Sequence, residues 1–419
     1  MIYWSYITVV RPIVSYASLV WWTKTNESSA QALLQKVQRL ACLNITGAMS
    51  TCPTAAMEVL LGLSPLHLHV KKEAALSAIK LSRTHKFKPG NLVGHLSILK
   101  DSTIEEMAAI PSDEIPMRYN FEQPFKVVIP DRHSWASGNP NSGKGSLNWF
   151  TDASKINGNT GIGIYGPNCR IRKALGQSTS VFQGELIAIQ QCASINLNKG
   201  LKGANINICS DSQAALKALR AFTYESRSVS ECLDTLTALA KSNKVNLIWV
   251  PGHEGIEGNE KADELAKKGA NCPFVGPEPF NGVPKSHKTT KIKHWEDLQM
   301  ASHWKNTPGQ KHAKRFIIYS PKRAKQILSF NKVDLRLITG LLTGHCCLKY
   351  HLHKIGKSED STCRFCNEAP ETAEHILCSC EAISFKRLDH LSKAFLTPTE
   401  VVEQSPKSIL AFAKSLDIS

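Results

Sequence analysis

Four carboxylates in the middle of the chain occupy positions from which distant segments can converge. Asp152 in the segment WFTD and Asp211 in the segment ICSD each follow a strand-like run, so we expect each to end a strand. Glu185 falls in the first turn of a helical pattern, and Asp263 falls in the first turns of another, behind the loop PGHEGIEGNE. Because each acid comes from a different element, a fold can bring all four together at one edge of a sheet.

Four carboxylates packed together repel each other and raise each other's pKa unless a cation lies between them. Oxygen ligands select hard divalent ions, so this set predicts Mg²⁺ or Mn²⁺ rather than zinc. Two such ions about 3.5–4 Å apart activate a water molecule and stabilise the leaving oxygen of a phosphodiester. The residue types therefore predict metal-dependent hydrolysis of a phosphodiester.

Each residue taken alone also has an ordinary structural interpretation. Asp211 precedes a helical run, QAALKAL, and an acid there can serve only as a helix N-cap. Glu185 and Asp263 suit solvated first-turn positions, which the helix dipole favours for acids, and His253 suits an exposed loop. Only the ordered set of motifs separates a catalytic site from these alternatives.

Residues 145–271 alternate strand-like and helix-like segments in the order βββαβααβα. The first three strands are short and are separated by turn-forming residues at 157–159 and 167–168, which predicts an antiparallel meander. The later strands alternate with helices, which predicts parallel pairing through crossover connections. We therefore expect an α/β fold: a mixed five-stranded sheet with helices on its faces, flanked by a helical N-terminal segment and a small Cys/His C-terminal segment.

The motifs WFTDAS, FQGELIAI, ICSDSQAAL and WVPGHEGIEGNEKADELAKKGA, in this order and spacing, resemble those of type 1 ribonuclease H. The resemblance implies the ribonuclease H-like fold and an enzyme that cuts the RNA strand of RNA–DNA hybrids with two Mg²⁺ or Mn²⁺ ions. Carried over residue by residue, it implies that Asp152, Glu185, Asp211 and Asp263 bind the metal. His253 matches the family's mobile histidine, which is thought to assist proton transfer or product release, and a neutral-range pKa suits either role.

The same resemblance implies contacts to the minor groove of the hybrid, where 2′-hydroxyls distinguish RNA from DNA. Four residues near the motifs are candidates for these contacts: Asn157, Gln183, Gln213 and Asn259. The sequence departs from family members that insert a basic handle between two helices, because its segment AFTYESRSVSE is short and holds no lysine cluster. Tight binding of a hybrid is therefore expected to depend on the flanking segments.

The chain is basic, with 51 Lys plus Arg against 35 Asp plus Glu among 419 residues, and its net charge of +16 suggests a polyanionic partner. Residues 285–336 alone hold 13 basic and 3 acidic residues, which gives +10. The runs KHAKR and PKRAK lie near Trp304, Phe316 and Tyr319, so this stretch is predicted to grip nucleic acid through charge and stacking. The alternative is a solvated basic linker.

The first 22 residues are apolar, but they have no basic leading region and no small-residue cleavage site, and Arg11-Pro12 interrupts them. We interpret them as a buried helix of a protein without membrane contact. Thirteen cysteines are too sparse for a disulfide scaffold, and Cys192 and Cys209 fall in apolar-periodic segments. These features predict an intracellular protein, cytoplasmic or nuclear, in a reducing compartment.

The N-terminal region, which includes VVRPIVSYASLVWW and a helical pattern at 30–48 and 64–81, resembles the region after the polymerase core of jockey-like non-LTR retrotransposon reverse transcriptases. The Tyr-x-Asp-Asp motif of that core is missing, and the sequence contains no Asp-Asp pair. The chain is therefore not expected to polymerise. The resemblance implies the C-terminal part of such a polyprotein.

Towards the C-terminus, Cys363, Cys366, His375 and Cys380 follow the pattern C-x2-C-x8-H-x4-C, which resembles the Cys-Cys-His-Cys segment of the same polyproteins. Three thiolates and one imidazole suit tetrahedral Zn²⁺ in a structural role, with RNA contact as a further role. Cys378 is an alternative to Cys380. The competing interpretation is a helical tail whose reduced cysteines act as small hydrophobes.

These motifs predict five parts: a helical segment at 1–85, a linker at 86–144, the ribonuclease H domain at 145–271, a basic Pro-containing linker at 272–335, and a helical segment with the Cys/His cluster at 336–419. The first functional hypothesis is an active hybrid-cleaving endoribonuclease. The second is a catalytically silent remnant that only binds nucleic acid, and the third is a structural adaptor. Four intact acids favour the first, and the oligomeric state has no signature in the sequence.

Overall fold

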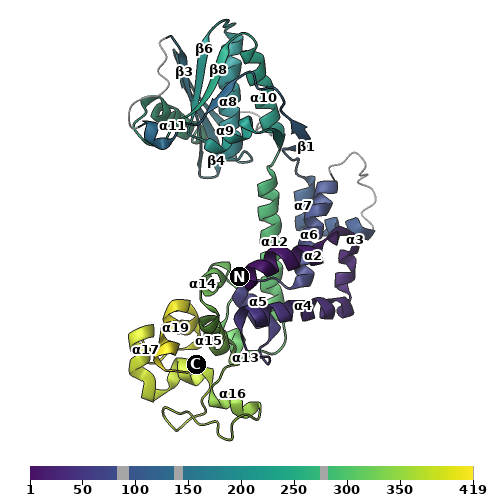
Figure 1. Cartoon of the computed structure of the whole chain (residues 1–419), viewed down its shortest axis with the longest axis vertical. Helices are drawn as coiled ribbons and strands as arrows, with labels where there is room; N and C mark the ends of the chain where they lie inside the picture. The colour runs from purple at the N-terminus through teal and green to yellow at the C-terminus, as the bar shows by residue number, and fades with distance from the viewer. Residues whose placement is uncertain (83–93, 136–144, 274–281, 419) are drawn as a thin grey trace. The chain divides into compact units, whose positions relative to one another are not determined.

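The computed structural model of the chain describes residues 1–82, 94–135, 145–273 and 282–418. Two compact units divide the chain: unit 1 combines Met1–Ala108 with Thr290–Ser419, and unit 2 spans Ala109–Thr289 (Figure 1). Parts of the two predicted linkers, at 86–144 and 272–335, lie outside the described residues. Each unit has a hydrophobic core of its own.

Unit 2 is built on a mixed sheet with the strand order β2-β8-β6-β3-β4-β5. Strands β3, β4 and β5 pair antiparallel as a meander, whereas β3, β6 and β8 pair in parallel. Both predicted pairing modes, and with them the α/β fold class, are confirmed. The strands are β2 (Lys126–Val128), β3 (Leu147–Ile156), β4 (Asn159–Gly166), β5 (Cys169–Gly176), β6 (Asn205–Ser210) and β8 (Lys244–Trp249).

The sheet has six strands, one more than predicted. The additional strand β2 pairs in parallel with β8 and lies in the stretch interpreted as a linker. Strand β2 has only three residues, and these are too few for an alternating pattern to reveal a strand. The same stretch supplies β1 (Glu114–Tyr119), which pairs antiparallel with β7 (Thr223–Ser226) in a separate two-stranded sheet. Residues 114–128 therefore belong to the fold of unit 2.

Helices cover both faces of the sheet, and the alternation along β4 shows which helix lies on which face. Ile162 and Ile164 are buried in the clusters that also hold side chains of α8 (Val181–Asn198). Gly161 and Gly163 point the other way, towards the backbone of α11 (Glu257–Ala270). Helices α9 (Gln213–Arg220) and α10 (Arg227–Ala240) share the main core with α8 (Figure 1).

The close approach of α11 to β4 fixes the helix that carries Asp263. A Cβ atom at Gly163 would lie 2.0 Å from the carbonyl oxygen of Ala262 and 2.5 Å from the backbone nitrogen of Ala266. Both neighbours are backbone atoms, so the helix itself would have to move.

We expect Gly163→Ala to destabilise unit 2 by about 3 kcal/mol, because overpacking a close helix–sheet contact displaces backbone. Urea unfolding followed by circular dichroism measures this change. Arg172→Ala is the matched control, because Arg172 pairs with Gly163 across the ladder but is exposed. Equal stability of the Gly163→Ala variant and the control would contradict the packing argument.

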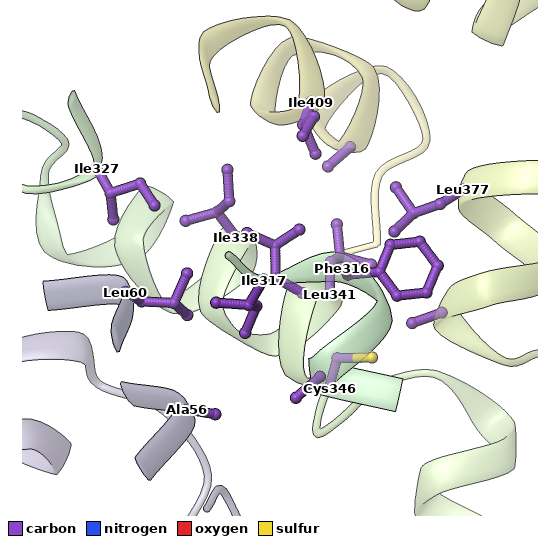
Figure 2. Close-up of a cluster of buried hydrophobic side chains, with 14 of the residues drawn as sticks. Ala56, Leu60, Phe316, Ile317, Ile327, Ile338, Leu341, Cys346, Leu377 and Ile409 are labelled. Carbon is purple, nitrogen blue, oxygen red and sulfur yellow. The ribbon is translucent and has the colours of Figure 1, made fainter. Parts of the chain in front are cut away.

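Unit 1 is all-helical, and its core joins segments from both ends of the chain. Side chains of α5 pack with those of α13, α14, α15, η5 and α19, as Figure 2 shows around Phe316, Ile338 and Leu341. The N-terminal elements are α1 (Ile2–Ser5), η1 (Tyr6–Val10), α2 (Arg11–Ser15), α3 (Ser18–Trp21), η2 (Trp22–Asn26), α4 (Ser28–Thr46), α5 (Thr54–Leu61), α6 (Leu66–Leu81), η3 (Gly94–Lys100) and α7 (Ser102–Ala109). The later ones are α12 (Lys285–Asn306), α13 (Lys311–Phe316), α14 (Pro321–Ile327), α15 (Lys332–Thr343), α16 (Lys349–Lys354), η5 (His375–Ser379), η6 (Glu381–Ile383), α17 (Ser384–Leu391), α18 (Pro398–Glu403) and α19 (Pro406–Ser415).

The first 22 residues are helical, but the prediction of a buried helix is wrong. Trp4, Ile13 and Tyr16 are 63%, 70% and 81% exposed. The apolar side chains of this segment point in several directions around the helices, and packing against the core on one side covers only some of them. Tyr6 and Trp22 are among the few that are buried. Among the described residues, none of the helices is both long enough and apolar enough to cross a bilayer.

The basic stretch 285–336 is also largely helical rather than an extended linker. It contains α12, α13, α14 and the start of α15. In α12, Ile292, Trp295, Met300 and Trp304 are all buried although lysines and histidines surround them in the sequence. The apolar residues recur at helical spacing, which the high charge of the stretch conceals when composition alone is considered.

A buried carboxylate links three helices of unit 1. Glu58 of α5 is 3% exposed and accepts a hydrogen bond of 2.9 Å from the Gln38 side chain of α4. Gln38 in turn accepts hydrogen bonds from Tyr6 and from Arg11 of α2. Burial raises the pKa of Glu58 to about 7, although Gln38 and Arg11 oppose the rise.

A carboxyl whose pKa is raised in the folded state gives stability that is fully present below its unfolded pKa and is lost as pH rises through 7. We therefore expect Glu58→Gln to leave unit 1 unchanged near pH 4 and to stabilise it by up to about 3 kcal/mol at pH 8.5, where only the parent buries a charge. Hydrogen–deuterium exchange of α4 and α5 peptides at both pH values measures the difference. The control, Glu73→Gln, alters a half-exposed acid of α6 and should show no such pH dependence. A Glu58→Gln effect of equal size at both pH values would contradict the assignment.

Candidate functional site

Asp152 and Asp211 are neighbours because of the register between β3 and β6. The last pair of this parallel ladder is Thr151 with Ser210, and each aspartate is the next residue. Asp211 ends its strand as predicted, whereas Asp152 lies within β3, which continues to Ile156 in its pairing with β4. The expectation that Asp152 ends a strand is therefore wrong. The pairing of β3 with β6 ends one residue before Asp152, at Thr151, and Asp152 is buried there, with 6% of its surface exposed.

Glu185 reaches the same edge from α8. Ser180 caps this helix and fixes where its first turn begins. The Glu185 carboxylate accepts hydrogen bonds from the backbone N–H of Ala153 at 3.2 Å and from the Ser210 hydroxyl at 3.3 Å, so the two strands orient it. Carboxylate oxygens of Asp152, Glu185 and Asp211 all lie within 4.8 Å of one another. Three of the four predicted acids thus converge.

Asp263 lies beside this group but not within it. Its carboxylate forms an ion pair of 2.6 Å with Lys267, one turn further along α11. Asp263 is nevertheless close enough to raise the pKa of Asp152 and of Asp211, and Lys267 lowers the pKa of Asp152. Lys267 is therefore the cation that pairs with Asp263.

Burial and mutual repulsion make the ionised form of these acids costly. Burial, with Asp211 and Asp263 nearby, raises the pKa of Asp152 to about 7. Burial raises the pKa of Glu185 well above its ordinary range, and the charges of Asp152 and Asp211 add to the rise. Burial also raises the pKa of Asp211, whereas a hydrogen bond from Asn259 and the proximity of His253 oppose this.

The loop before α11 completes the site on the Asp211 side. The backbone approaches so closely at Gly252 that a Cβ atom there would lie 2.8 Å from Oδ2 of Asp211. Trp249 donates its indole N–H to the carbonyl oxygen of Asp211 at 3.0 Å. His253 of the same loop is exposed and has a φ of +57°. It lies close enough to Asp211 to lower the pKa of that carboxyl.

The four predicted substrate contacts fare differently. Gln183 is fully buried. Its Oε1 accepts a hydrogen bond from the backbone N–H of Ser180, and its Nε2 donates one to the carbonyl oxygen of Gly282. Gln183 is therefore a capping residue, and the prediction that it contacts the substrate is wrong. Asn259 is buried and bonds Asp211, so it orients a carboxylate. Asn157 is an exposed turn residue between β3 and β4, with a φ of +48°. Gln213 is half-buried at the start of α9 and accepts from Lys217 at 2.9 Å.

The acidic group suits a hard divalent cation. Every donor atom is a carboxylate oxygen, three elements supply them, and neighbouring groups already fix two of the carboxylates. The repulsion that raises the pKa values is what a cation among these oxygens would remove. The residues therefore fit Mg²⁺ or Mn²⁺.

Comparison with known protein families agrees with this class of site, a carboxylate cluster at the edge of a mixed sheet. A family model described as RNase H matches residues 144–271 of the chain. This stretch is a ribonuclease H domain, and the match supports a ribonuclease that acts on RNA–DNA hybrids. The matched residues include all four predicted acids and His253.

A second cluster of ligand-type side chains lies in unit 1. The donor atoms of Cys363, Cys366, His375 and Cys380 all lie within 4.8 Å of one another. The sulfurs of Cys363 and Cys380 are 3.8 Å apart, and Sγ of Cys366 is 3.3 Å from Nε2 of His375. Bonds of about 2.3 Å to a tetrahedral zinc ion place two sulfurs about 3.8 Å apart. The spacing therefore fits Zn²⁺.

The surrounding residues hold this cluster in place and decide between the two candidate cysteines. Cys378 is buried in the core of unit 1 and lies outside the group, so Cys380 is the fourth member. Glu371 accepts from the Arg364 backbone N–H at 2.8 Å and from its guanidinium, which braces the turn between Cys363 and Cys366. The buried Arg387 donates to the carbonyl oxygen of Cys380.

Two of the three predicted stacking faces of the basic stretch are buried, and the third is partly buried. Trp304 and Phe316 are buried in the core of unit 1, and Tyr319 donates to Asp297 at 2.5 Å. Some charges of the basic stretch are also engaged, since Arg315 pairs with Glu374 at 2.5 Å and Arg323 donates to the carbonyl oxygens of Val402 and Gln404. The prediction that Trp304 and Phe316 stack on bases is therefore wrong.

Most residues that support the two sites were not predicted from the sequence, and Asn259 was predicted only as a substrate contact. Ser210 and Asn259 lie inside the motifs that carry the acids, and their polar side chains next to a predicted ligand were the available signal. Arg364 and Glu371 pair across the Cys/His turn, which no local spacing rule reveals. The role of such residues depends on which ligand they contact, and their own chemical type does not reveal it.

Proposed function

We propose that this protein hydrolyses the RNA strand of RNA–DNA hybrids with the help of two divalent ions, Mg²⁺ or Mn²⁺. The observation that carries the proposal is the convergence of Asp152, Glu185 and Asp211 from three separate elements to within 4.8 Å. The match of residues 144–271 to the ribonuclease H family supports the same activity. In this proposal Asp263 is the fourth ligand.

The roles of the side chains follow from their surroundings. Asp152, Glu185 and Asp211 hold the ions, with Ala153, Ser210 and Asn259 as their hydrogen-bonding partners. When bound, the ions supply an activated water molecule and charge stabilisation at the leaving 3′ oxygen. Asp263 would hold a metal ion in place of its ion pair with Lys267, because this pair is partly exposed and readily broken.

Other residues are assigned to proton transfer and substrate contact. His253 stands on the loop beside Asp211, exposed and free to approach the scissile phosphate, where it assists proton transfer or product release. Gln213 lies two residues after Asp211 and is partly accessible, so we assign it, with Asn157, to contacts with the hybrid. Substrate contact by Gln183 is not part of the proposal.

Incubation of the full chain with an end-labelled RNA–DNA hybrid tests this activity. We expect cleavage with Mg²⁺ or Mn²⁺, loss of cleavage in EDTA, no recovery with Zn²⁺ alone, and a loss of at least about 100-fold in Asp211→Asn, because a metal ligand is removed. Asp234→Asn, an exposed acid of α10 in the same unit, is the matched control and should cleave like the parent. Equal rates for both variants, or no cleavage by the parent, would favour a protein that only binds nucleic acid.

The Cys/His cluster is proposed as a structural Zn²⁺ site. The distances between its donor atoms support this, as does the side chain of Arg387, which ties Cys380 to neighbouring backbone. Zinc would hold together a segment in which regular helices are short, and this suits a structural role.

Metal analysis of purified protein tests the zinc site and the choice of its fourth ligand. We expect about one zinc ion per parent chain and a clear loss of zinc in Cys380→Ser, because three remaining ligands bind more weakly. Cys378→Ser should retain the metal, because its thiol is buried in the core outside the group. Full zinc content in Cys380→Ser would contradict the assignment.

The cellular setting is also part of the proposal. The N-terminal motifs and the Cys/His segment support a retrotransposon-derived protein, and the activity on hybrids suits an element that copies RNA into DNA. All thirteen cysteines are free thiols, which is consistent with an intracellular, reducing compartment. Nucleic acid is the proposed partner.

A further inference from the structure

Unit 1 contains a large cavity that the proposed nuclease does not use. Its volume is about 730 Å³. It is lined by the loop before α5, the start of α13, the loop after α15, α16 and the residues just before His375. A volume in this range accommodates a ligand as large as a nucleotide.

Three histidines line this cavity, and two of them, His345 and His351, are joined by one hydroxyl group. Oγ1 of Thr51 lies 3.1 Å from Nδ1 of His345 and 3.1 Å from Nε2 of His351, and the two rings are 4.7 Å apart between centroids. Within the described part of the chain, the second nitrogen of each ring has no hydrogen-bond partner and is not among the buried orphan atoms. Two ring nitrogens therefore remain without a hydrogen-bond partner in the described structure, although His351 as a whole is only 6% exposed.

The position of Thr51 is fixed by its surroundings. Arg39 of α4 donates to the carbonyl oxygens of Ser50 and Cys52 and to the Thr54 hydroxyl, which holds the loop on both sides of Thr51. The arrangement of histidines and hydroxyl is thus preorganised by a side chain outside the cavity.

The charge of the lining favours an anion. Lys311 and Lys354 are exposed at the cavity, and Lys354 is close enough to both histidines to lower their pKa values, together with the larger effect of burial. The acid in the lining, Glu374, is already paired with Arg315. Tyr350 adds an aromatic ring that is 43% exposed.

We propose that this cavity binds one nucleotide of single-stranded nucleic acid, with its phosphate at Lys311 and Lys354 and its base against Tyr350. These ring nitrogens of His345 and His351 give hydrogen-bonding groups for the edge of the base. Cationic groups with an accessible aromatic ring are typical of single-strand binding, whereas an acidic peptide would not use the ring and the imidazoles in this way. This site does not depend on the proposed hydrolysis.

The test uses an eight-nucleotide, fluorescein-labelled single-stranded RNA and the zinc-loaded full chain, with Asp152→Asn in every variant to prevent cleavage. We expect Lys311→Glu with Lys354→Glu to weaken binding at least about 10-fold and to lower the salt dependence by about 0.7 for each phosphate that the variant no longer neutralises. Tyr350→Ala should weaken binding about 5- to 100-fold, and Tyr350→Phe should bind like the parent, because its ring is retained. Fluorescence anisotropy measures all of these affinities.

Lys36→Glu is the matched control, because Lys36 is an exposed lysine of α4 in the same unit away from the cavity lining. Its binding should stay within about twofold of the parent. Equal losses in the control and the cavity variants, no loss in the cavity variants, or competition by oligoglutamate as strong as by unlabelled RNA would each overturn the proposal. Thermal unfolding and zinc content check that each variant is folded. Cleavage of the hybrid by chains with Asp152 intact is measured separately, so failure of one proposal does not affect the other.

Discussion

The central physical constraint of this protein is the repulsion among three carboxylates that the fold holds within 4.8 Å at one edge of a sheet. Burial makes their charges more costly, and the pKa of Asp152 rises to about 7 as a result. A fold that served stability alone would separate these groups or pair them with basic residues, as it does for Asp263 and Lys267. A divalent cation among these oxygens would remove the repulsion, and the metal-dependent function that we propose therefore accounts for the site better than capping or solvation of single acids.

The rest of unit 2 maintains the geometry of this edge. Register sets the spacing of Asp152 and Asp211, since both follow the last pair of one parallel ladder. The capping of α8 fixes the turn that carries Glu185, and Gln183 contributes to that cap. The glycine face of β4 lets α11 approach until its backbone touches the sheet, which brings Asp263 beside the other acids. Each carboxylate is thus positioned by backbone pairing or close packing. Side-chain motion changes such contacts less than it changes contacts between long side chains.

The sequence predicted the fold class and the segments that meet at the site, because strands and helices alternate with clear turn residues and the acids stand at fixed places within them. It did not predict features that depend on a distant partner. Strand β2 can be recognised only from its pairing with β8. The burial of Gln183 likewise involves a distant residue, because its side chain donates to the carbonyl oxygen of Gly282. Trp304 and Phe316 were expected to be free because lysines surround them, yet tertiary packing turns those residues inward. The choice of Cys380 over Cys378 also required their positions in the folded structure, since both cysteines suit the spacing in the sequence.

The net charge of a segment in this chain therefore does not show how many of its cations are available to bind a ligand. The stretch 285–336 carries +10, but several of its cations serve the fold: Arg323 holds two carbonyl oxygens, Arg315 pairs with Glu374, and Lys314 donates to the carbonyl oxygens of Lys305 and Thr307. A cation that already satisfies backbone acceptors loses those bonds if it turns to a phosphate, so it contributes less to binding than its charge implies. Lysines that line a cavity beside imidazoles and an aromatic ring have no such cost. The affinity for nucleic acid that we propose for unit 1 therefore depends on where its cations are unpaired, and the count of cations is a poor guide to it.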